Sequence, residues 1–538
     1  MSRRQAGVVA GCFVVAFLAM SLFLAWFLVD HDYEAEYLAL GDLVVRGNLN
    51  LYQDEVTGQW VPMPFWVYGL SQVVFGPSLL AGRLVSIALT LGVLALVYAL
   101  ALRWRGPLAA AVAAGLLCTN GLVMGYFATV HFSPLAALLM LAGVFVLFSG
   151  PLGPSRDLLA MAVFSLLFLV KPHYWPAIPF ALMYIVLWRQ PALRTRLAVV
   201  AVALAVPAIF FVWDVRHLKM LAYMPIVKAW VAPLGYHSWH TLVEDPEVLW
   251  VSDYVDVVYA ATMPERVVQI VKSFGFFVKR YAIWLVVLGG LTMLAPPWRR
   301  REGESAGRPA GEKFCFWLFW YLVAWQFVIV GVYIKQAFAY VGALTPLLAL
   351  SMGCLFADAW ERRRTAPALR TAAVALVLLA LILSPWVHRS HYMARTVSLA
   401  DAAVPGLNRA AARIAALIPA DERRVFSLAN PLPLHLAQRL PYLRQYHQYY
   451  MVFTSARDPR LYTRSGLWGM TEIEQWLGSD ARYAVIEPKV ITFYGARQPY
   501  KEPVARIETL LAARFDLLET VQGRVGEAYR IYRRKGEG

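Results

Sequence analysis

Acidic residues are scarce in the apolar part of the chain, and several of them gather directly after its first apolar run. Asp30, Asp32, Glu34 and Glu36 precede Tyr37. An apolar helical pattern continues from there to residue 47, and residues four apart share one face of a helix. A carboxylate in this place can take a proton from an attacking hydroxyl. It can also simply complement the dipole of a helix start, so both interpretations stay open.

Basic residues form the second group with chemical potential. Arg83 opens an apolar segment that follows the proline-aromatic stretch Pro64-Phe65-Trp66 and the junction Phe75-Gly76-Pro77-Ser78. Its fork of donors suits a lipid phosphate, although an arginine there can also snorkel to lipid headgroups. Lys171 and Lys335 likewise stand at the ends of apolar segments.

Composition places these residues in a membrane protein. Hydrophobic residues make up 59% of the 538 positions and charged residues 16%, which is typical of a polytopic helical chain. The net charge of +16 comes from short clusters between apolar runs, which argues against a nucleic-acid-binding face. The length of the apolar runs predicts about eleven spans. They are expected at 7–29, 83–102, 108–128, 132–149, 158–170, 175–188, 197–213, 277–295, 314–333, 339–357 and 371–386.

Short loops between the spans indicate the orientation. Arginines concentrate in alternate loops, for example at 103–105, 189–196 and 362–364. The short loops on the opposite side hold single basic residues, Lys171 and Lys335. The positive-inside rule therefore predicts a cytoplasmic N-terminus. The odd number of spans places the C-terminal part outside, in a multi-pass protein of the bacterial inner (plasma) membrane.

This topology predicts two domains. Residues 1–386 form the membrane domain, with outward loops at 30–82 and 215–276. The first loop is expected to hold two helices on the outer membrane surface. Residues 387–538 are expected to form a small extracytoplasmic α/β domain. Its strand-like runs are 424–428, 483–487 and 528–533, and its helical pattern spans 406–418.

The order of these features resembles the GT-C superfamily of polyprenyl-phosphate-sugar-dependent glycosyltransferases. The nearest branch contains the protein O-mannosyltransferases and the lipid A aminoarabinose transferases. The resemblance covers residues 7–357 and rests on pattern rather than one sharp signature. The family's features look like Glu34 with Tyr37, Gly47, the proline-aromatic segment, Arg83 after its junction, Lys171-Pro172, and Lys335, Tyr340 and Pro346.

The sequence departs from that family pattern in two places. The family's acidic pair precedes the tyrosine by four and three residues, but Tyr33 takes the first position here. The base is therefore Glu34, Asp32 or, third, Glu36. Relatives that bind a divalent metal use an acid where the third span emerges, and this stretch carries His131 and no carboxylate. We therefore expect no metal and no cofactor. His131 has either a polar role toward substrate or the role of a span cap.

The resemblance implies transfer of a sugar, with inversion, from a polyprenyl-phosphate donor to an acceptor hydroxyl at the outward face. Glu34 or Asp32 would be the base. The residues expected to contact substrate are Arg83, Lys171, Lys335, Tyr37, Tyr340 and His131. The acceptor is a lipid, glycan or protein. Alternatives are a secondary transporter, although no related halves are visible, and a different cell-envelope glycan polymerase or ligase.

Overall fold

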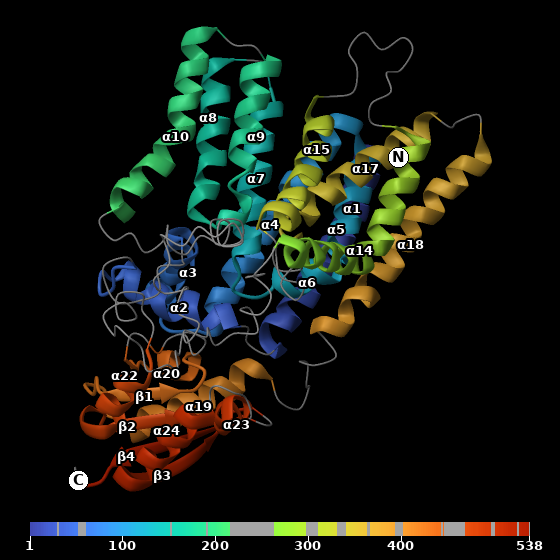
Figure 1. The fold of residues 1–538 in the computed structure, drawn as a ribbon. Helices are drawn as coiled ribbons and strands as arrows, with labels where there is room; N and C mark the ends of the chain where they lie inside the picture. The colour runs from blue at the N-terminus through green and yellow to red at the C-terminus, as the bar shows by residue number, and fades with distance from the viewer. Residues whose placement is uncertain are drawn as a thin grey trace. The chain divides into compact units, whose positions relative to one another are not determined.

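A computed structural model gives the fold of this chain (Figure 1). It describes the backbone of all residues except 29–31, 52–60, 151–152, 190–191, 216–262, 297–309, 331–340, 363–365, 393–401, 443–444, 446–467, 496–500, 525–526 and 537–538. The chain divides into two compact units. Unit 1 comprises Met1–Ala25, Leu84–Val212 and Arg266–Thr396, and unit 2 joins Trp26–Arg83 to Val397–Gly538 and to a middle segment at 213–265.

Unit 1 is built from helices. Its α-helices are α1 (Arg3–Phe27), most of α4 (Leu79–Arg105), α5 (Pro107–Thr119), α6 (Gly121–Tyr126), α7 (Phe132–Phe148), α8 (Pro154–Ser165), α9 (Ala177–Met183), α10 (Leu193–Val215), α14 (Met263–Leu294), α15 (Ala310–Ala324), α17 (Thr345–Arg362) and α18 (Pro367–Tyr392). Short 3-10 helices are η1 (Leu166–Leu169) and η2 (Pro172–Tyr174), and π-helical stretches are η3 (Tyr184–Arg189) and η5 (Trp325–Val330).

Four of the described helices are long and apolar enough to cross a membrane: α1, α4, α14 from Ile270 onward, and α18 as far as Trp386. Three shorter apolar stretches are Pro107–Thr119, Phe132–Phe148 and Ala177–Arg189. The helical membrane architecture matches the sequence analysis, and the count of about eleven spans stays a prediction. Several expected spans fall on helices that are broken into α, 3-10 and π pieces, so their length does not equal that of one continuous span.

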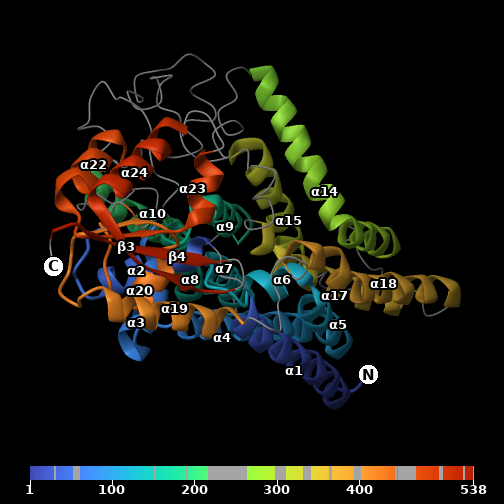
Figure 2. The same cartoon turned by 90° about the horizontal axis from the view of Figure 1, so that it is seen from below.

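Close packing in unit 1 depends on small residues and buried charges. A Cβ atom at Gly353 of α17 would lie 2.7 Å from the carbonyl oxygen of Ala109 of α5, so these helices meet backbone to backbone (Figure 2). Arg105, near the end of α4, donates to both carboxylate oxygens of Glu312. Asp358 lies 3.9 Å from the same guanidinium, and all three side chains are nearly or fully buried. These charges therefore tie the ends of α4, α15 and α17 together.

In unit 2, the N-terminal part is a pair of crossed helices, α2 (Asp32–Val45) and α3 (Pro62–Phe75). Pro62 and Pro64 suit the first turn of α3, and Gly76 ends it with φ +79°. A Cβ atom at Gly69 would lie 2.1 Å from the carbonyl oxygen of Gly41. Glycine is therefore required on both sides of this crossing.

The C-terminal part of unit 2 contains a sheet in the order β1-β2-β4-β3. Its strands are β1 (Val425–Leu428), β2 (Tyr483–Ile486), β3 (Phe515–Gln522) and β4 (Ala528–Arg534). β1 pairs with β2 in parallel, β4 pairs antiparallel with β2 and β3, and a bulge interrupts the last pair at Leu517/Glu519. The accompanying helices are α19 (Ala403–Leu417), α20 (Leu432–Leu436), α22 (Met470–Gln475), the π-helix η9 (Trp476–Asp480), α23 (Pro488–Gly495) and α24 (Lys501–Arg514).

Helices cover both faces of this sheet because buried side chains alternate along its central strands. Phe426 and Ile486 pack in one cluster with residues of α22, η9 and α24. Val425 and Val485 pack in the other with residues of α19 and α20, and Figure 2 shows these helices on opposite sides of the strands. The domain boundary expected between residues 386 and 387 stays a prediction.

Candidate functional site

Glu34 and Arg83 form a buried ion pair at the beginning of α2 and α4. The guanidinium donates from Nε to Oε1 over 2.8 Å and from Nη2 to Oε2 over 2.6 Å. Its Nη1 donates over 2.8 Å to the carbonyl oxygen of Leu28, which follows α1. Both side chains are fully buried. Removing one partner of such a pair leaves an uncompensated buried charge. The pair therefore holds Glu34, and with it the first turn of α2, in place.

Tyr37 lies one turn after Glu34 and packs against α3. Its ring contacts Phe65 edge to face at 5.1 Å and stacks on Tyr68 at 6.1 Å between centroids. The Tyr37 side chain is 1% exposed. Aromatic pairs of this kind add to the burial of apolar area, so Tyr37 holds the crossing of α2 and α3. Its predicted contact with substrate stays a prediction.

The turn between α3 and α4 is held by Gln72. Its carboxamide donates to the carbonyl oxygen of Ser78 over 3.1 Å and accepts from the Ser78 N–H over 2.8 Å. The Ser78 hydroxyl accepts from the N–H of Ala81 in the first turn of α4, as a capping side chain does. His435 of α20 places Nε2 at 3.2 Å from the Gln72 amide oxygen. Unit 2 thus connects its C-terminal part to the turn that precedes Arg83.

Burial shifts the pKa of His435 strongly. The side chain is 4% exposed, and burial, followed by the charge of Arg46, lowers its pKa to about 4. The neutral imidazole therefore donates to Gln72 at neutral pH. The sequence analysis did not single out Gln72 or His435. A signal existed for Gln72, because it stands beside Ser71 in an otherwise apolar helix, but none existed for His435.

In unit 1, Lys171 and His131 occur in one aromatic cluster. The Lys171 ammonium lies 5.1 Å from the centroid of Phe132, and the His131 ring is 4.0 Å from the same ring. His131 is the N-cap of α7, where Nδ1 accepts from the Ser133 N–H over 3.2 Å. Gln326 donates to the carbonyl oxygen of His173 over 3.0 Å. The cluster therefore gathers a cation and several polar groups beside the turn at Lys171-Pro172.

Lys171 stands outside the apolar helices in the connection between η1 and η2. Burial lowers the pKa of its ammonium to about 7, and burial together with Lys171 lowers the pKa of His173 well below its usual range. Removal from water disfavours the charged form of an amine. An anion bound beside Lys171 would therefore be strongly stabilising, because it would restore the charge.

Other predicted residues cannot be placed. Lys335 and Tyr340 lie outside the described residues, and the side chain of Asp32 does too, although its backbone begins α2. Glu36 is described and buried. In the described part of the chain, no three His, Cys, Asp or Glu side chains gather as a metal-binding group. The expectation of a metal-independent protein stays a prediction.

Comparison with known proteins identifies the fold. No protein-family model matches the sequence, and no curated protein matches it. Among solved structures, ArnT from Cupriavidus metallidurans bound to undecaprenyl phosphate is similar with a TM-score of 0.56 and 14% identity, over 98% of both chains. The Archaeoglobus fulgidus oligosaccharyltransferase in complex with zinc and sulfate is similar with a TM-score of 0.51 and 12% identity, over 90% of this chain and 69% of that one.

A third similar structure is the mycobacterial arabinofuranosyltransferase AftD. It has a TM-score of 0.50 and 14% identity, and the match covers 99% of this chain but 40% of that one. These three proteins are glycosyltransferases of one superfamily. By this likeness the chain has the fold of the GT-C glycosyltransferases, as its sequence pattern indicated.

Proposed function

We propose that this protein is a membrane glycosyltransferase that moves a sugar from a polyprenyl-phosphate donor to an acceptor hydroxyl. The match to ArnT bound to undecaprenyl phosphate, over 98% of both chains, carries the proposal. The acidic cluster of α2 and the cationic Lys171 supply groups that the reaction needs. Fold alone does not specify a reaction, so the roles below are argued from the residues.

The proposed reaction is a single displacement at the anomeric carbon. The acceptor oxygen attacks this carbon and forms the new glycosidic bond, while a carboxylate takes the hydroxyl proton. The bond from the anomeric carbon to the phosphate oxygen breaks, and its electron pair leaves with the polyprenyl phosphate. The anomeric configuration inverts. The reaction therefore needs a base on one side and positive charge beside the phosphate on the other.

For the base, we propose Asp32 ahead of Glu34. Both oxygens of Glu34 accept hydrogen bonds from Arg83, and both side chains are fully buried. In this arrangement Glu34 and Arg83 act as positioning residues that fix the first turn of α2. Asp32 stands half a turn earlier on the same helix. If Glu34 is the base, the donor phosphate must first draw Arg83 away from it.

For the leaving phosphate, we propose Lys171 as one cationic ligand. It is buried beside the ring of Phe132, where an ion pair is weakened little by solvent. Lys335 would be a second ligand, and Tyr340 and His131 would contact the sugar or its phosphate. The reaction would take place at the outward face of the inner membrane. The sugar is a hexose, a pentose or a related amino sugar, and the acceptor is a lipid, glycan or protein.

The test is consumption of polyprenyl-phosphate sugars by the purified protein in lipid nanodiscs. Wild type would be compared with Asp32→Asn, Glu34→Gln and the exposed control Ala505→Phe on α24. We expect turnover of at least one donor, loss of about a hundredfold or more in Asp32→Asn, and full activity in the control. Equal activity of Asp32→Asn and wild type would exclude Asp32 as the base. If no donor binds to intact protein, the proposed glycosyltransferase function is wrong.

A further inference from the structure

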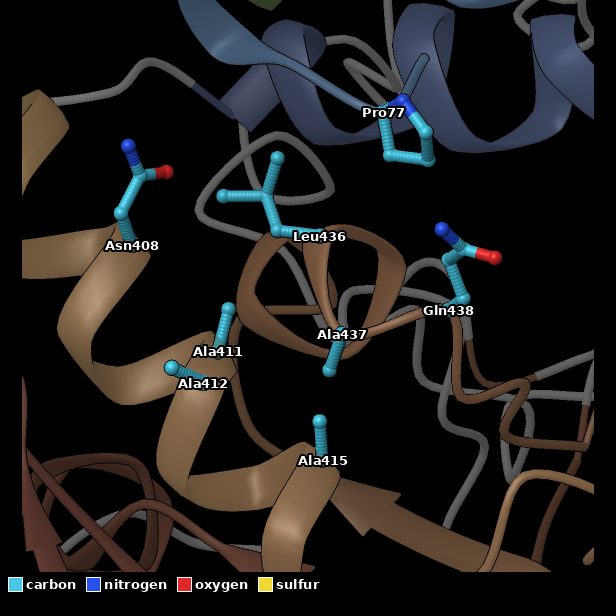
Figure 3. Close-up of a pocket in the computed structure, with 8 residues that line it drawn as sticks. All are labelled: Pro77, Asn408, Ala411, Ala412, Ala415, Leu436, Ala437 and Gln438. Atoms are coloured by element: carbon cyan, nitrogen blue, oxygen red, sulfur yellow. The ribbon is translucent and has the colours of Figure 1, made fainter.

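A groove in unit 2 lies beside the turn that leads into α4. Its volume is about 330 Å³. Pro77 of that turn contributes one wall, and α19 and the residues after α20 contribute the rest. Figure 3 shows that the carboxamides of Asn408 and Gln438 stand at opposite ends. The space is within the range of pockets that bind small molecules.

The floor of the groove is made of methyl groups. Ala411, Ala412 and Ala415 of α19 lie along it, and Ala437 faces them (Figure 3). Leu436 closes the side below Pro77 in the same view. The lining side chains carry no charge, so the groove suits a neutral ligand rather than a phosphate or a carboxylate. Small side chains also keep the floor flat and open.

The backbone at Gln438 is held in an unusual conformation. Its φ is +55°, and among the described residues it is the non-glycine residue with positive φ. Such a conformation costs roughly 1–2 kcal/mol for a residue with a Cβ atom. The neighbouring Arg439 also holds this turn, since its guanidinium donates to the carbonyl oxygens of Ile418, Ala437 and Ala415 over 2.7, 3.0 and 2.9 Å. The conformation is that of a helix C-terminus, because the Arg439 N–H donates to the carbonyl oxygen of Leu434 over 2.8 Å and the Gln438 N–H to that of His435 over 2.9 Å. This end of α20 fixes the residue that carries one of the two carboxamides.

The groove is also tied to the α3–α4 turn. His435, three residues before Gln438, contacts Gln72, and Gln72 makes two hydrogen bonds with Ser78, next to Pro77. The turn before Arg83 and the end of α20 that lines the groove are therefore joined by hydrogen bonds within unit 2. A ligand in this groove would lie on the same rigid turn that positions the Glu34–Arg83 pair.

We propose that this groove binds a neutral sugar ring of the acceptor, as an acceptor subsite of the transferase. The proposal rests on the proposed function. A sugar ring has an apolar C–H face, which fits a floor of alanine methyl groups, and a rim of hydroxyls. A carboxamide both donates and accepts, so it can bind two neighbouring hydroxyls of such a rim. An extended peptide would instead need backbone partners, and the helix α19 that forms the floor presents none along its length.

The experiment measures binding to the full-length protein in nanodiscs by fluorescence polarisation. The probes are neutral trisaccharides of mannose, glucose, galactose and arabinose, each with a fluorescent tag at the reducing end. Gln438→Gly removes the carboxamide while keeping the positive φ free of strain. Gln438→Asn keeps a carboxamide in a residue that tolerates this conformation. Ala412→Phe fills the floor from an exposed position, and Ala505→Phe is the matched control on α24.

We expect at least one trisaccharide to bind wild type, and about tenfold weaker binding in Gln438→Gly through loss of one or two hydrogen bonds. Binding should be lost in Ala412→Phe, intermediate in Gln438→Asn and unchanged in the control. Failure of all four trisaccharides, or equal binding by Gln438→Gly and wild type, would overturn the subsite. A tagged peptide that binds and is displaced by the same substitutions would also overturn it. Donor consumption on the same wild-type sample tests the proposed function separately.

Discussion

Arg83 donates two hydrogen bonds to Glu34, a residue 49 positions earlier in the chain, and the two side chains are fully buried. This pair connects the first turn of α2 with the second turn of α4. A third donation reaches the carbonyl oxygen of Leu28. Three chain segments therefore depend on one guanidinium.

Replacing Arg83 by methionine should destabilise the protein by roughly 3–5 kcal/mol, because the buried Glu34 carboxylate then loses its counter-charge. The double variant Arg83→Met with Glu34→Gln should recover part of this loss, since no unpaired charge remains. Thermal unfolding in nanodiscs measures both. If the double variant is no more stable than Arg83→Met, the ion pair is not the source of the loss.

The crossing of α2 and α3 should tolerate no side chain at Gly69. A Cβ atom there would meet the backbone of Gly41 at 2.1 Å, so Gly69→Ala must push the helices apart, at a cost of about 1–3 kcal/mol or more. Gly11→Ala is the control, because a Cβ atom at that helical position meets nothing within 4 Å. Alanine is favoured over glycine inside a helix, so the control should equal or exceed wild type in melting temperature.

Donor binding should weaken as the pH rises if Lys171 holds the phosphate. Burial lowers the pKa of Lys171 to about 7 in the protein without donor, so above this pH the protein must take up a proton to bind the anion. The donor Kd should then rise about tenfold per pH unit above neutrality, until the pKa of the complex is reached. The Kd of a labelled donor analogue, measured at pH values from about 6 to about 9, tests this dependence.

Lys171→Arg is the matched control for that titration, because arginine keeps its charge throughout this range. Its donor affinity should vary little with pH. Lys171→Met should lose about tenfold to hundredfold in affinity at pH values below neutrality, where the wild-type ammonium is charged. A pH profile shared by wild type and Lys171→Arg would show that another group titrates.

Acid should destabilise unit 2 through His435. Its pKa in the folded state is about 4, below the ordinary value near 6.5, so the unfolded chain binds the proton more readily. The stability contributed by neutral His435 is complete above pH 6.5 and is lost as the pH falls toward 4, by roughly 3 kcal/mol in total. His435→Gln should show a smaller fall in melting temperature between pH 7 and 5. The same fall in both proteins would contradict the assignment.

Sequence patterns predicted local elements well where apolar spacing was clear. The two helices after the first apolar run appear as α2 and α3, and Arg83 opens α4 within its first turns. The three strand-like runs correspond to β1, β2 and β4. β3 was missed because it lies at the edge of the sheet and most of its side chains are at least partly exposed, so it shows no apolar alternation.

Long-range contacts of the site did not follow from the sequence. Glu34 and Arg83 were assigned separate roles, as base and phosphate ligand, because nothing in the spacing shows that they pair. His435 and Gln72 are 363 positions apart, and no local pattern connects them. The identity of the base remains a prediction, since the Asp32 side chain lies outside the described residues.

Because unit 2 is assembled from segments far apart in the sequence, it cannot form until the chain is nearly complete. Its helices α2 and α3 leave the ribosome early, whereas α19, α20 and the sheet belong to Val397–Gly538. At about 5–20 residues per second, roughly 20–70 s separate synthesis of Arg83 from that of α20. During this interval Gln72 has no His435 beside it. Nascent chains that stop before α20 should therefore expose the surface of α3 around Gln72 to proteases and chaperones, and degradation of incomplete chains can begin there.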